Sequence, residues 1–320
     1  MEYKNIDGVK MPVSRLVFGT ASDPFIEGKD QSELLDAALE AGINIIDTAR
    51  KYGDSEKSIG KWLQSRNTRD KVVILSKCAH HNMLGIKRVN EKAIRNDFEL
   101  SSKDLGTDFI DIYLLHRDDP EVDAGVPVEI FNAMHAEGKI GIFGASNWTH
   151  ERIEEANEYA YKHNLIPFTI SSPHFSLARQ VADPWGGGCV SITGDENKDA
   201  RLWYQKNQMP VFAYSSLGRG LLTGKLKSED ALHASQVLDK FALKGYGCVD
   251  NYIRLKKCEE LADKKGCTVS QIAMAWLYHQ PENTFAIATM SSPKRIQENV
   301  DALSIDLSDE ECEYLLDAED

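Results

Sequence analysis

Short apolar stretches alternate with amphipathic helical patterns about eight times along this chain. The apolar stretches are three to six residues long and rich in β-branched side chains, which is typical of buried strands. Strands that alternate with helices form parallel βα units, and eight such units predict an α/β fold, the (β/α)8 TIM barrel, as a single domain over residues 1–320. The expected strands are 16–18, 43–46, 72–76, 110–115, 140–143, 168–170, 211–213 and 285–287.

The intervening patterns predict helices of ordinary length. Their approximate ranges are 30–41, 89–104, 127–137, 150–163, 251–265, 269–279 and 293–302, with a further helix opening at Ser55. Residues 3–13 alternate around Asp7-Gly8, a turn signal that predicts an N-terminal hairpin. Residues 173–200 and 215–250 are glycine-containing connections whose length is typical either of functional lids or of disordered segments.

The charge and the cysteines of the 320-residue chain restrict the classes of partner. The net charge of −13 argues against nucleic acid or an anionic membrane as a partner. No apolar run is long enough to span a bilayer, and the first ten residues lack a signal-peptide pattern. The six cysteines are scattered without a C-x-x-C pair, so we expect reduced thiols, no structural metal and a cytoplasmic location. The oligomeric state is left open.

The stretch 42–60, GINIIDTARKYGDSEKSIG, indicates where the site lies. Asp47 follows an apolar strand, yet the next helix opens only at Ser55, eight residues later, so Asp47 does not serve as its cap. Tyr52 lies in the same loop. In a TIM barrel the functional residues come from the carboxyl ends of the strands, and two further strands end at Lys77 and at His116.

These four residue types suit proton transfer to a carbonyl or alcohol oxygen. A tyrosine hydroxyl has an ordinary pKa of about 10, and a nearby ammonium lowers it by favouring the phenolate. Asp47 would hold Lys77 in place, Tyr52 would exchange the proton, and His116 would orient the substrate oxygen. No side chain supplies a hydride, so a nicotinamide cofactor is implied. Tyr214 offers an aromatic face for that ring.

Each of these residues alone is more often structural, whereas their joint occurrence at the ends of separate strands favours function. Ser146-Asn147 offers hydroxyl and amide groups for a carboxamide. The glycines of 218–224 have the wrong spacing for a Rossmann fingerprint. A barrel hydrolase would need a metal cluster or paired acids at the strand ends, which the pattern lacks.

With these motifs in view, the chain resembles the aldo-keto reductase superfamily over nearly its whole length. The stretch 42–60 carries the most specific part of the resemblance, and the runs GASN at 144–147, AYSSLGRG at 213–220 and RIQEN at 295–299 extend it. The resemblance implies a catalytic tetrad of Asp47, Tyr52, Lys77 and His116. It also implies cofactor contacts from Gly19, Thr20, Asp47, Ser146, Asn147, Ser172, Tyr214, Ser215, Leu217, Arg219, Arg295, Glu298 and Asn299.

The chain departs from the family pattern in ways that bear on the cofactor. The sixth strand usually ends in Gln, and the best-aligned residue here is the shorter Ser172. Ser216 replaces a frequent Pro, and the eighth strand is followed by Ala-Thr-Met rather than a basic or glycine-rich turn. Arg295 is then the main candidate for binding the ribose phosphate of NADPH, so we expect NADPH, with NADH possible.

We therefore expect an NAD(P)H-dependent oxidoreductase acting on a small carbonyl or alcohol substrate. The alternative is a cofactor-binding regulatory protein of the same fold with little turnover. The residues expected to rim the substrate pocket mix polar groups with tryptophan faces, which favours a polar, sugar-like substrate over a steroid. They are Asp23, Phe25, His80, His81, Asn82, Arg117, Trp148 and Trp185, beside Tyr52 and His116.

Overall fold

The computed structural model describes residues 1–82 and 84–318. Within these residues, eight parallel strands form a closed barrel in the order β10-β3-β4-β5-β6-β7-β8-β9. This topology confirms the prediction of a (β/α)8 barrel. The strands are β3 (Leu16–Gly19), β4 (Ile45–Asp47), β5 (Val73–Cys78), β6 (Ile110–Leu115), β7 (Ile140–Ser146), β8 (Ile170–Ser172), β9 (Val211–Ala213) and β10 (Thr284–Ala288).

The chain divides into two compact units, residues 1–172 with 289–293 and residues 173–288 with 294–320. The first unit contains a hairpin of β1 (Tyr3–Lys4) and β2 (Val13–Ser14), in which Tyr3 pairs with Ser14. Gly8 in its turn has a φ of +85°, and a Cβ there would lie 2.4 Å from Cγ2 of Ile142. The predicted N-terminal hairpin is therefore confirmed, and glycine is required at its turn.

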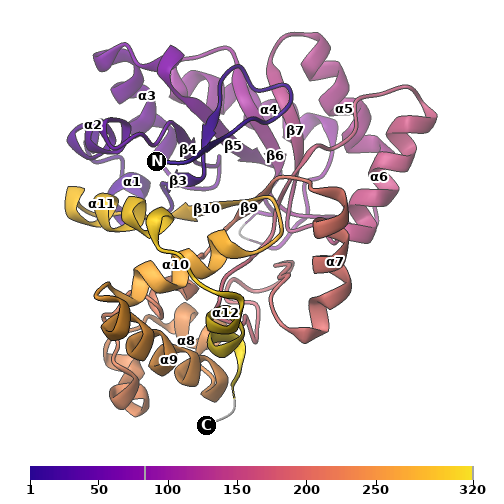
Figure 1. Cartoon of the computed structure of the whole chain (residues 1–320). Helices are drawn as coiled ribbons and strands as arrows, with labels where there is room; N and C mark the ends of the chain where they lie inside the picture. The colour runs from indigo at the N-terminus through magenta and orange to yellow at the C-terminus, as the bar shows by residue number, and fades with distance from the viewer. Residues whose placement is uncertain (83, 319–320) are drawn as a thin grey trace. The chain divides into compact units, whose positions relative to one another are not determined.

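The strands β3 to β8 of the first unit are buried along their whole length and are mainly apolar on both faces, as in other parallel sheets. Their buried polar residues are Asp47, Ser76, Lys77, Asp111, Ser146, Ser171 and Ser172. Their connecting helices are α1 (Asp23–Ile26), α2 (Ser32–Glu40), α3 (Ser55–Arg66), α4 (Glu91–Leu105), α5 (Gly125–Ala136) and α6 (His150–Lys162). Helix α5 packs against α6 (Figure 1), and α3 packs against α4. A Cβ on Gly60 of α3 would lie 2.2 Å from the carbonyl oxygen of Asp104 in α4, so this contact needs glycine.

The second unit contains β9 and β10, whose Phe212 and Phe285 rings stack with centroids 4.8 Å apart. Helix α9 packs against α10 and α12 (Figure 1). The helices are α7 (Lys198–Asn207), α8 (Lys240–Tyr246), α9 (Val249–Lys265), α10 (Val269–His279), α11 (Pro293–Asp301) and α12 (Asp309–Leu316). Short 3₁₀ segments occur at Arg69–Lys71, Asp195–Asn197, Gly218–Gly220, Ser228–Gln236 and Ala302–Ser304.

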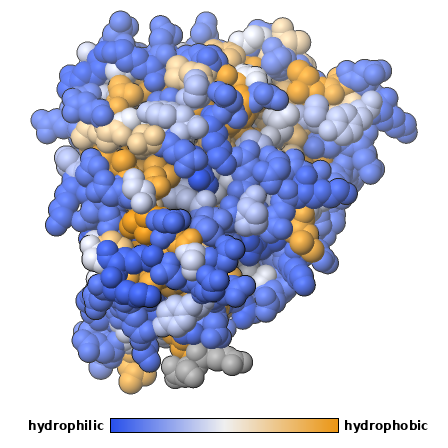
Figure 2. All heavy atoms as spheres, viewed as in Figure 1, coloured by the Kyte–Doolittle hydropathy of each residue, from blue (hydrophilic) through white to orange (hydrophobic). Residues whose placement is uncertain are grey.

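The face shown in Figure 2 is mainly hydrophilic, and its hydrophobic residues form small groups between polar ones. Among the residues that the structure describes, no helix is both long and apolar enough to cross a bilayer.

Candidate active site

The predicted catalytic residues lie at the carboxyl ends of the neighbouring parallel strands β4, β5 and β6. Asp47 is the last residue of β4, Lys77 is the penultimate residue of β5, and His116 directly follows β6. Backbone hydrogen bonds extend the ladder past the strand ends, from Arg50 N to Lys77 O at 3.0 Å and from His116 N to Cys78 O at 2.8 Å. The barrel therefore gathers these side chains at one edge.

Lys77 and Asp47 form a buried ion pair. Each residue is 3% exposed, and the Lys77 ammonium donates to Asp47 Oδ1 and, at 3.1 Å, to the carbonyl oxygen of Thr48. Burial disfavours the ammonium, yet the charge of Asp47 and the contact with Tyr52 together raise the pKa of Lys77 above its ordinary value. Lys77 therefore carries a positive charge at neutral pH.

Tyr52 lies in the loop between β4 and α3, with its ring beside that ammonium. Lys77 Nζ is 5.3 Å from the Tyr52 ring centroid. The loop is a tight turn, because Tyr52 N donates to Ala49 O at 2.9 Å and Ser55 N donates to Tyr52 O at 3.0 Å. Gly53 follows with a φ of +57°, and a Cβ there would lie 2.5 Å from the carbonyl oxygen of Ile26. The turn thus fixes where the Tyr52 ring points.

The expected lowering of the Tyr52 pKa is wrong in its net direction. Burial of the hydroxyl raises the pKa of Tyr52, and this effect outweighs the lowering by the Lys77 charge. Tyr52 is therefore a neutral phenol at neutral pH that retains a proton to donate. Lys77 still reduces the free-energy cost of losing that proton.

His116 faces Tyr52 edge-on, with ring centroids 5.6 Å apart. It is buried, and burial together with the nearby positive charges holds its pKa well below the ordinary value. The imidazole is therefore neutral, with one N–H to donate. Its Nδ1 atom is buried and has no hydrogen-bond partner among the described residues. The ring of His80 lies 4.7 Å from that of His116 and extends the cluster.

A second buried cluster supports the loop and the strand that carry Tyr52 and Lys77, and the sequence reasoning missed it. Glu56 of α3 is fully buried and accepts hydrogen bonds from Ser76 at 2.6 Å and Ser101 at 3.0 Å. Its carboxylate also pairs with Arg50 at 2.8 Å, and Arg50 pairs with Asp104 at 2.7 Å. The sequence signal that could have revealed this cluster is Glu56 itself, the second residue of the helix that follows the Tyr52 loop.

The residues expected to hold the carboxamide and the first-strand end lie in the same unit, and they are tied into the backbone. Ser146 Oγ donates to Ser172 O at 2.7 Å, and Asn147 Nδ2 donates to His116 O at 3.2 Å. Thr20, which follows Gly19 of β3, donates its hydroxyl to Asp47 O at 2.9 Å. These bonds hold the strand ends in register around His116 and Asp47. The cofactor contacts of these residues stay predictions.

The residues predicted to rim the substrate pocket differ in exposure. Asp23 is exposed, and His80 is partly exposed. Arg117 is 6% exposed and lies close enough to lower the pKa of His116 by its charge, after the larger effect of burial. Phe25 and Trp148 are each 1% exposed.

The two buried aromatic residues of this group pack in the interior. The Phe25 ring lies 5.8 Å from that of Phe18, and the Trp148 ring lies 5.5 Å from that of Phe168. These contacts give both side chains a packing role, and their contact with substrate stays a prediction.

In the second unit, the segment after β9 brings aromatic rings and a guanidinium together. The Tyr214 and Trp185 ring centroids are 6.0 Å apart. The Arg219 guanidinium lies 5.5 Å from the Trp185 ring and 5.3 Å from the Phe241 ring, and it pairs with Asp239 at 2.9 Å. Arg219 is therefore held in one orientation. Ser215 and Leu217 of this segment are partly exposed, and Ser215 has a φ of +53°.

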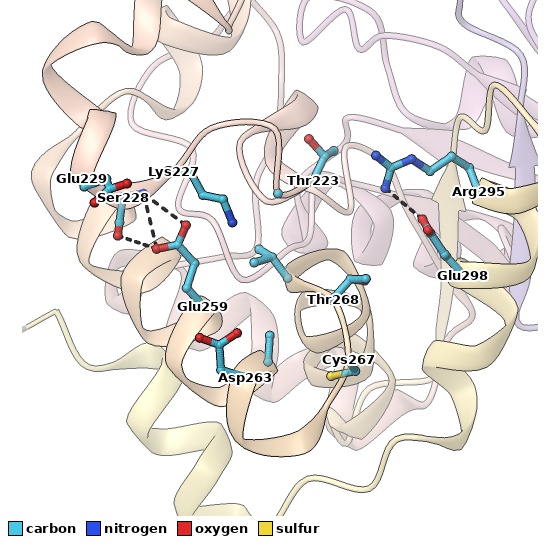
Figure 3. A pocket seen from close by; sticks show the side chains of 13 residues that line it. Thr223, Lys227, Ser228, Glu229, Glu259, Asp263, Cys267, Thr268, Arg295 and Glu298 are labelled. Carbon is cyan, nitrogen blue, oxygen red and sulfur yellow. Dashed lines mark hydrogen bonds and ion pairs between the residues drawn. The ribbon is translucent and has the colours of Figure 1, made fainter.

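Arg295 and Glu298 line a cavity of about 590 Å³ in the second unit, together with residues that the sequence reasoning did not select (Figure 3). Arg295 donates to Glu298 at 2.9 Å. Lys227 points into the space between Glu259 and Thr223. The lining consists of Thr223, Gly224, Lys227, Ser228, Glu229, Glu259, Ala262, Asp263, Cys267, Thr268, Val269, Arg295 and Glu298.

Asn299 follows the cavity residues on α11. Its Nδ2 donates to Arg295 O at 2.8 Å, and its buried Oδ1 has no partner among the described residues. A buried amide oxygen is costly to leave unpaired, so this atom is suited to accept a hydrogen bond from a ligand.

Comparisons with known proteins agree with the fold. A sequence model of the Aldo/keto reductase family matches residues 15–320. The chain is 30% identical to the aldo-keto reductase str7 of Strobilurus tenacellus, over 89% of this chain and 80% of that protein. It is 29% identical to the aldo-keto reductase YhdN of Bacillus subtilis, over 93% of this chain and 87% of that protein.

A third relative carries a more specific name. The NADH-specific methylglyoxal reductase of Escherichia coli is 28% identical, over 88% of this chain and 85% of that protein. The class defined by the barrel and by these matches is that of the barrel oxidoreductases. The chain belongs to the Aldo/keto reductase family.

Proposed function

We propose that the protein is an NAD(P)H-dependent carbonyl reductase in which Tyr52 is the general acid. The observation that carries this proposal is the cluster of Asp47, Lys77, Tyr52 and His116 at the ends of three adjacent strands. The Lys77–Asp47 pair is buried, and the Lys77 ammonium lies over the Tyr52 ring. The neutral imidazole of His116 faces the Tyr52 ring edge-on. A pair of this kind beside a phenol that stays protonated is suited to acid catalysis.

Each side chain has a distinct part in the proton transfer. Tyr52 donates its hydroxyl proton to the substrate oxygen as that oxygen gains negative charge. The Lys77 ammonium stabilises the phenolate that remains, and Asp47 holds the ammonium against the ring. His116, being neutral, donates an N–H to the same oxygen and orients it. In the oxidation direction the same groups run in reverse, with Tyr52 as the base.

A bound nicotinamide supplies the hydride, which the side chains cannot. The described residues fit such a cofactor in two places of the second unit. The partly exposed Tyr214 ring is suited to stack on a planar ring. The unpaired Asn299 Oδ1 is suited to accept from the adenine amino group, beside the cavity that Arg295 lines. These residues would hold the cofactor.

We propose NADPH as the preferred cofactor, with NADH as the second candidate. Two cations, Arg295 and Lys227, line the cavity and can receive the ribose phosphate of NADPH. Glu298 competes with that phosphate for Arg295, because the two side chains pair at 2.9 Å. One relative is named as NADH-specific, which supports NADH as the second candidate.

The proposed substrate is a small polar carbonyl compound, which includes sugar-like aldehydes. Polar groups lie near Tyr52 in the first unit: the His116 ring faces the Tyr52 ring, and the charge of Arg117 acts on Tyr52. The ring of His80 lies beside that of His116. The assignment of the chain to a single domain and the cytoplasmic location both stay predictions.

The test is to follow the absorbance of reduced nicotinamide while the purified protein acts on a panel of aldehydes, ketones and sugars with each cofactor. Turnover that requires the Tyr52 hydroxyl supports the proposal, and the Tyr52→Phe variant is the control. Tight cofactor binding without turnover on any compound would favour the cofactor-binding regulatory protein instead.

A further inference from the structure

A basic cavity of about 260 Å³ lies beside the catalytic cluster in the first unit. Its basic lining residues are Arg50, Lys51, Lys77 and Arg88, whereas Asp97 is the acidic residue in that lining. The whole chain carries a net charge of −13. A cavity with this lining is therefore a local exception to the charge of the molecule.

Carboxylates neutralise most of these cations. Arg50 pairs with Glu56 at 2.8 Å and with Asp104 at 2.7 Å. Arg88 pairs with Asp97 at 2.7 Å, and a second hydrogen bond of 3.0 Å makes this contact bidentate.

Lys51 is the exception among the four. Lys77 is paired with Asp47, whereas Lys51 has no ion pair or hydrogen bond to any other described residue and is exposed. Its ammonium is therefore the charge in this lining that is available to a ligand.

The cavity adjoins the reacting groups. Lys77 lines it, and so does His80, whose ring lies 4.7 Å from the His116 ring. Lys51 directly precedes Tyr52 in the loop. A small molecule whose carbonyl oxygen is held by Tyr52 and His116 can therefore extend into this cavity.

The neighbouring charges favour an anion there. Desolvation lowers the pKa of His80 to about 4, and the charges of Arg117 and Lys51 add to this effect, so both cations act within reach of the imidazole. The carboxylates that follow His116 are already paired, Asp118 with Arg152 at 3.5 Å and Asp119 with Lys87 at 3.0 Å.

We propose that the substrate carries an anionic group, a carboxylate or a phosphate, a short distance from its carbonyl carbon, and that Lys51 determines this specificity. The inference rests on the proposed function and names the substrate class of the same site. A lysine ammonium is a compact charge that suits either anion without a fixed fork geometry.

The experiment compares matched substrates that differ in the anionic group. Succinic semialdehyde is compared with butanal, and glyceraldehyde phosphate is compared with glyceraldehyde, each by kcat/KM at low ionic strength. The expected result is a preference for the charged member of at least one pair. The first pair tests a carboxylate and the second tests a phosphate, so the preferred pair identifies the anion.

Variants then assign the preference to Lys51. Lys51→Gln should lower the charged-to-neutral ratio of kcat/KM by about threefold to fivefold, which is the upper range for an exposed ion pair. The loss should lie in KM rather than in kcat, and high salt should produce the same loss in the unsubstituted protein. Lys61→Gln is the matched control, because Lys61 is also exposed but lies outside the cavity lining.

The outcomes separate the inference from the function on which it rests. Turnover with equal kcat/KM for both members of each pair would overturn the inference alone. An equal loss in Lys51→Gln and Lys61→Gln would also overturn it, because net charge and not this site would set the preference. Absence of turnover with all four compounds and with the wider carbonyl panel would overturn both.

Discussion

Replacing Lys77 with Met separates the structural role of the buried ion pair from its catalytic role. Met keeps most of the length of the lysine stem but removes the ammonium. Asp47, which is 3% exposed, then loses its ion-pair partner. Removing one member of a buried pair typically costs about 3–5 kcal/mol, because a charge is left in a medium that solvates it poorly. We expect the free energy of unfolding of Lys77→Met to fall by about this amount.

The double variant Lys77→Met with Asp47→Asn supplies the matched control. Replacing both members of a buried pair with neutral groups is often close to neutral for stability. The double variant should therefore recover most of the stability that Lys77→Met loses, and the coupling free energy from the four-member cycle should exceed about 2 kcal/mol. Turnover should stay low in Lys77→Met, in Asp47→Asn and in the double variant, because each lacks at least one member of the pair that tunes Tyr52.

The assay is urea unfolding at neutral pH, with turnover measured on the same samples. The pKa of folded Lys77 is raised, so the contribution of the pair is fully present below the unfolded lysine pKa of about 10.4 and is lost as the pH rises through the folded value. Neutral pH therefore reports the whole contribution. A wild-type unfolding midpoint for Lys77→Met would refute the stability argument. Wild-type turnover in the double variant would refute the catalytic one.

Three further predictions follow from the same geometry. Tyr52→Phe should lower turnover by roughly 10²–10⁴-fold in single-turnover kinetics while cofactor affinity is retained, and unchanged chemistry would contradict the acid role. Arg295→Ala should weaken NADPH binding by about 1.5–3 kcal/mol and leave NADH nearly unchanged in a titration, with a smaller loss in Lys227→Met; an equal loss for both cofactors would count against phosphate recognition. Burial lowers the pKa of His80 in the folded protein to about 4, whereas the ordinary pKa of a histidine is about 6.5. As the pH drops, the unfolded chain therefore binds a proton at this residue before the folded protein does. The free energy of unfolding should fall as the pH drops from about 6.5 towards 4. His80→Gln should reduce this fall in urea midpoints, whereas His233→Gln at an exposed position should not; equal slopes would contradict the assignment.

The barrel and its order of elements could be predicted because a buried strand is visible in the sequence as a short apolar run. β6 and β9 were predicted with the bounds that the structure has, since β9 is wholly apolar and Asp111 is the one charged residue in β6. β8 was predicted at 168–170 and lies at Ile170–Ser172. Its two serines are buried, and the carbonyl oxygen of Ser172 accepts from Ser146. A strand that ends in hydroxyls can be recognised only when its neighbour is known.

The long connection 215–250 was harder to predict, because its α-helix α8 is short and carries a glycine near its end. Helix α8, which lies in the predicted loop 215–250, contains Gly245 and is followed by Gly247. Its start is nevertheless marked, because Asp239 caps it by accepting from the backbone N–H groups of Phe241 and Ala242. The signal that could have indicated this helix start was an Asp shortly before the apolar pair Phe241-Ala242.

The tetrad residues were selected from the sequence, whereas their electrostatics depended on burial and on distant partners. Glu56 meets Ser101, which is 45 positions away, and no spacing rule connects them. The error on Tyr52 has the same origin, because the charge of Lys77 was counted and the desolvation of the hydroxyl was not. The proposed reductase mechanism needs both effects. In that mechanism, burial would keep the proton on Tyr52 until a substrate oxygen could take it, and Lys77 would lower the free energy of the phenolate once the proton had gone. Either effect alone would leave the acid without its proton or the phenolate without its counter-charge.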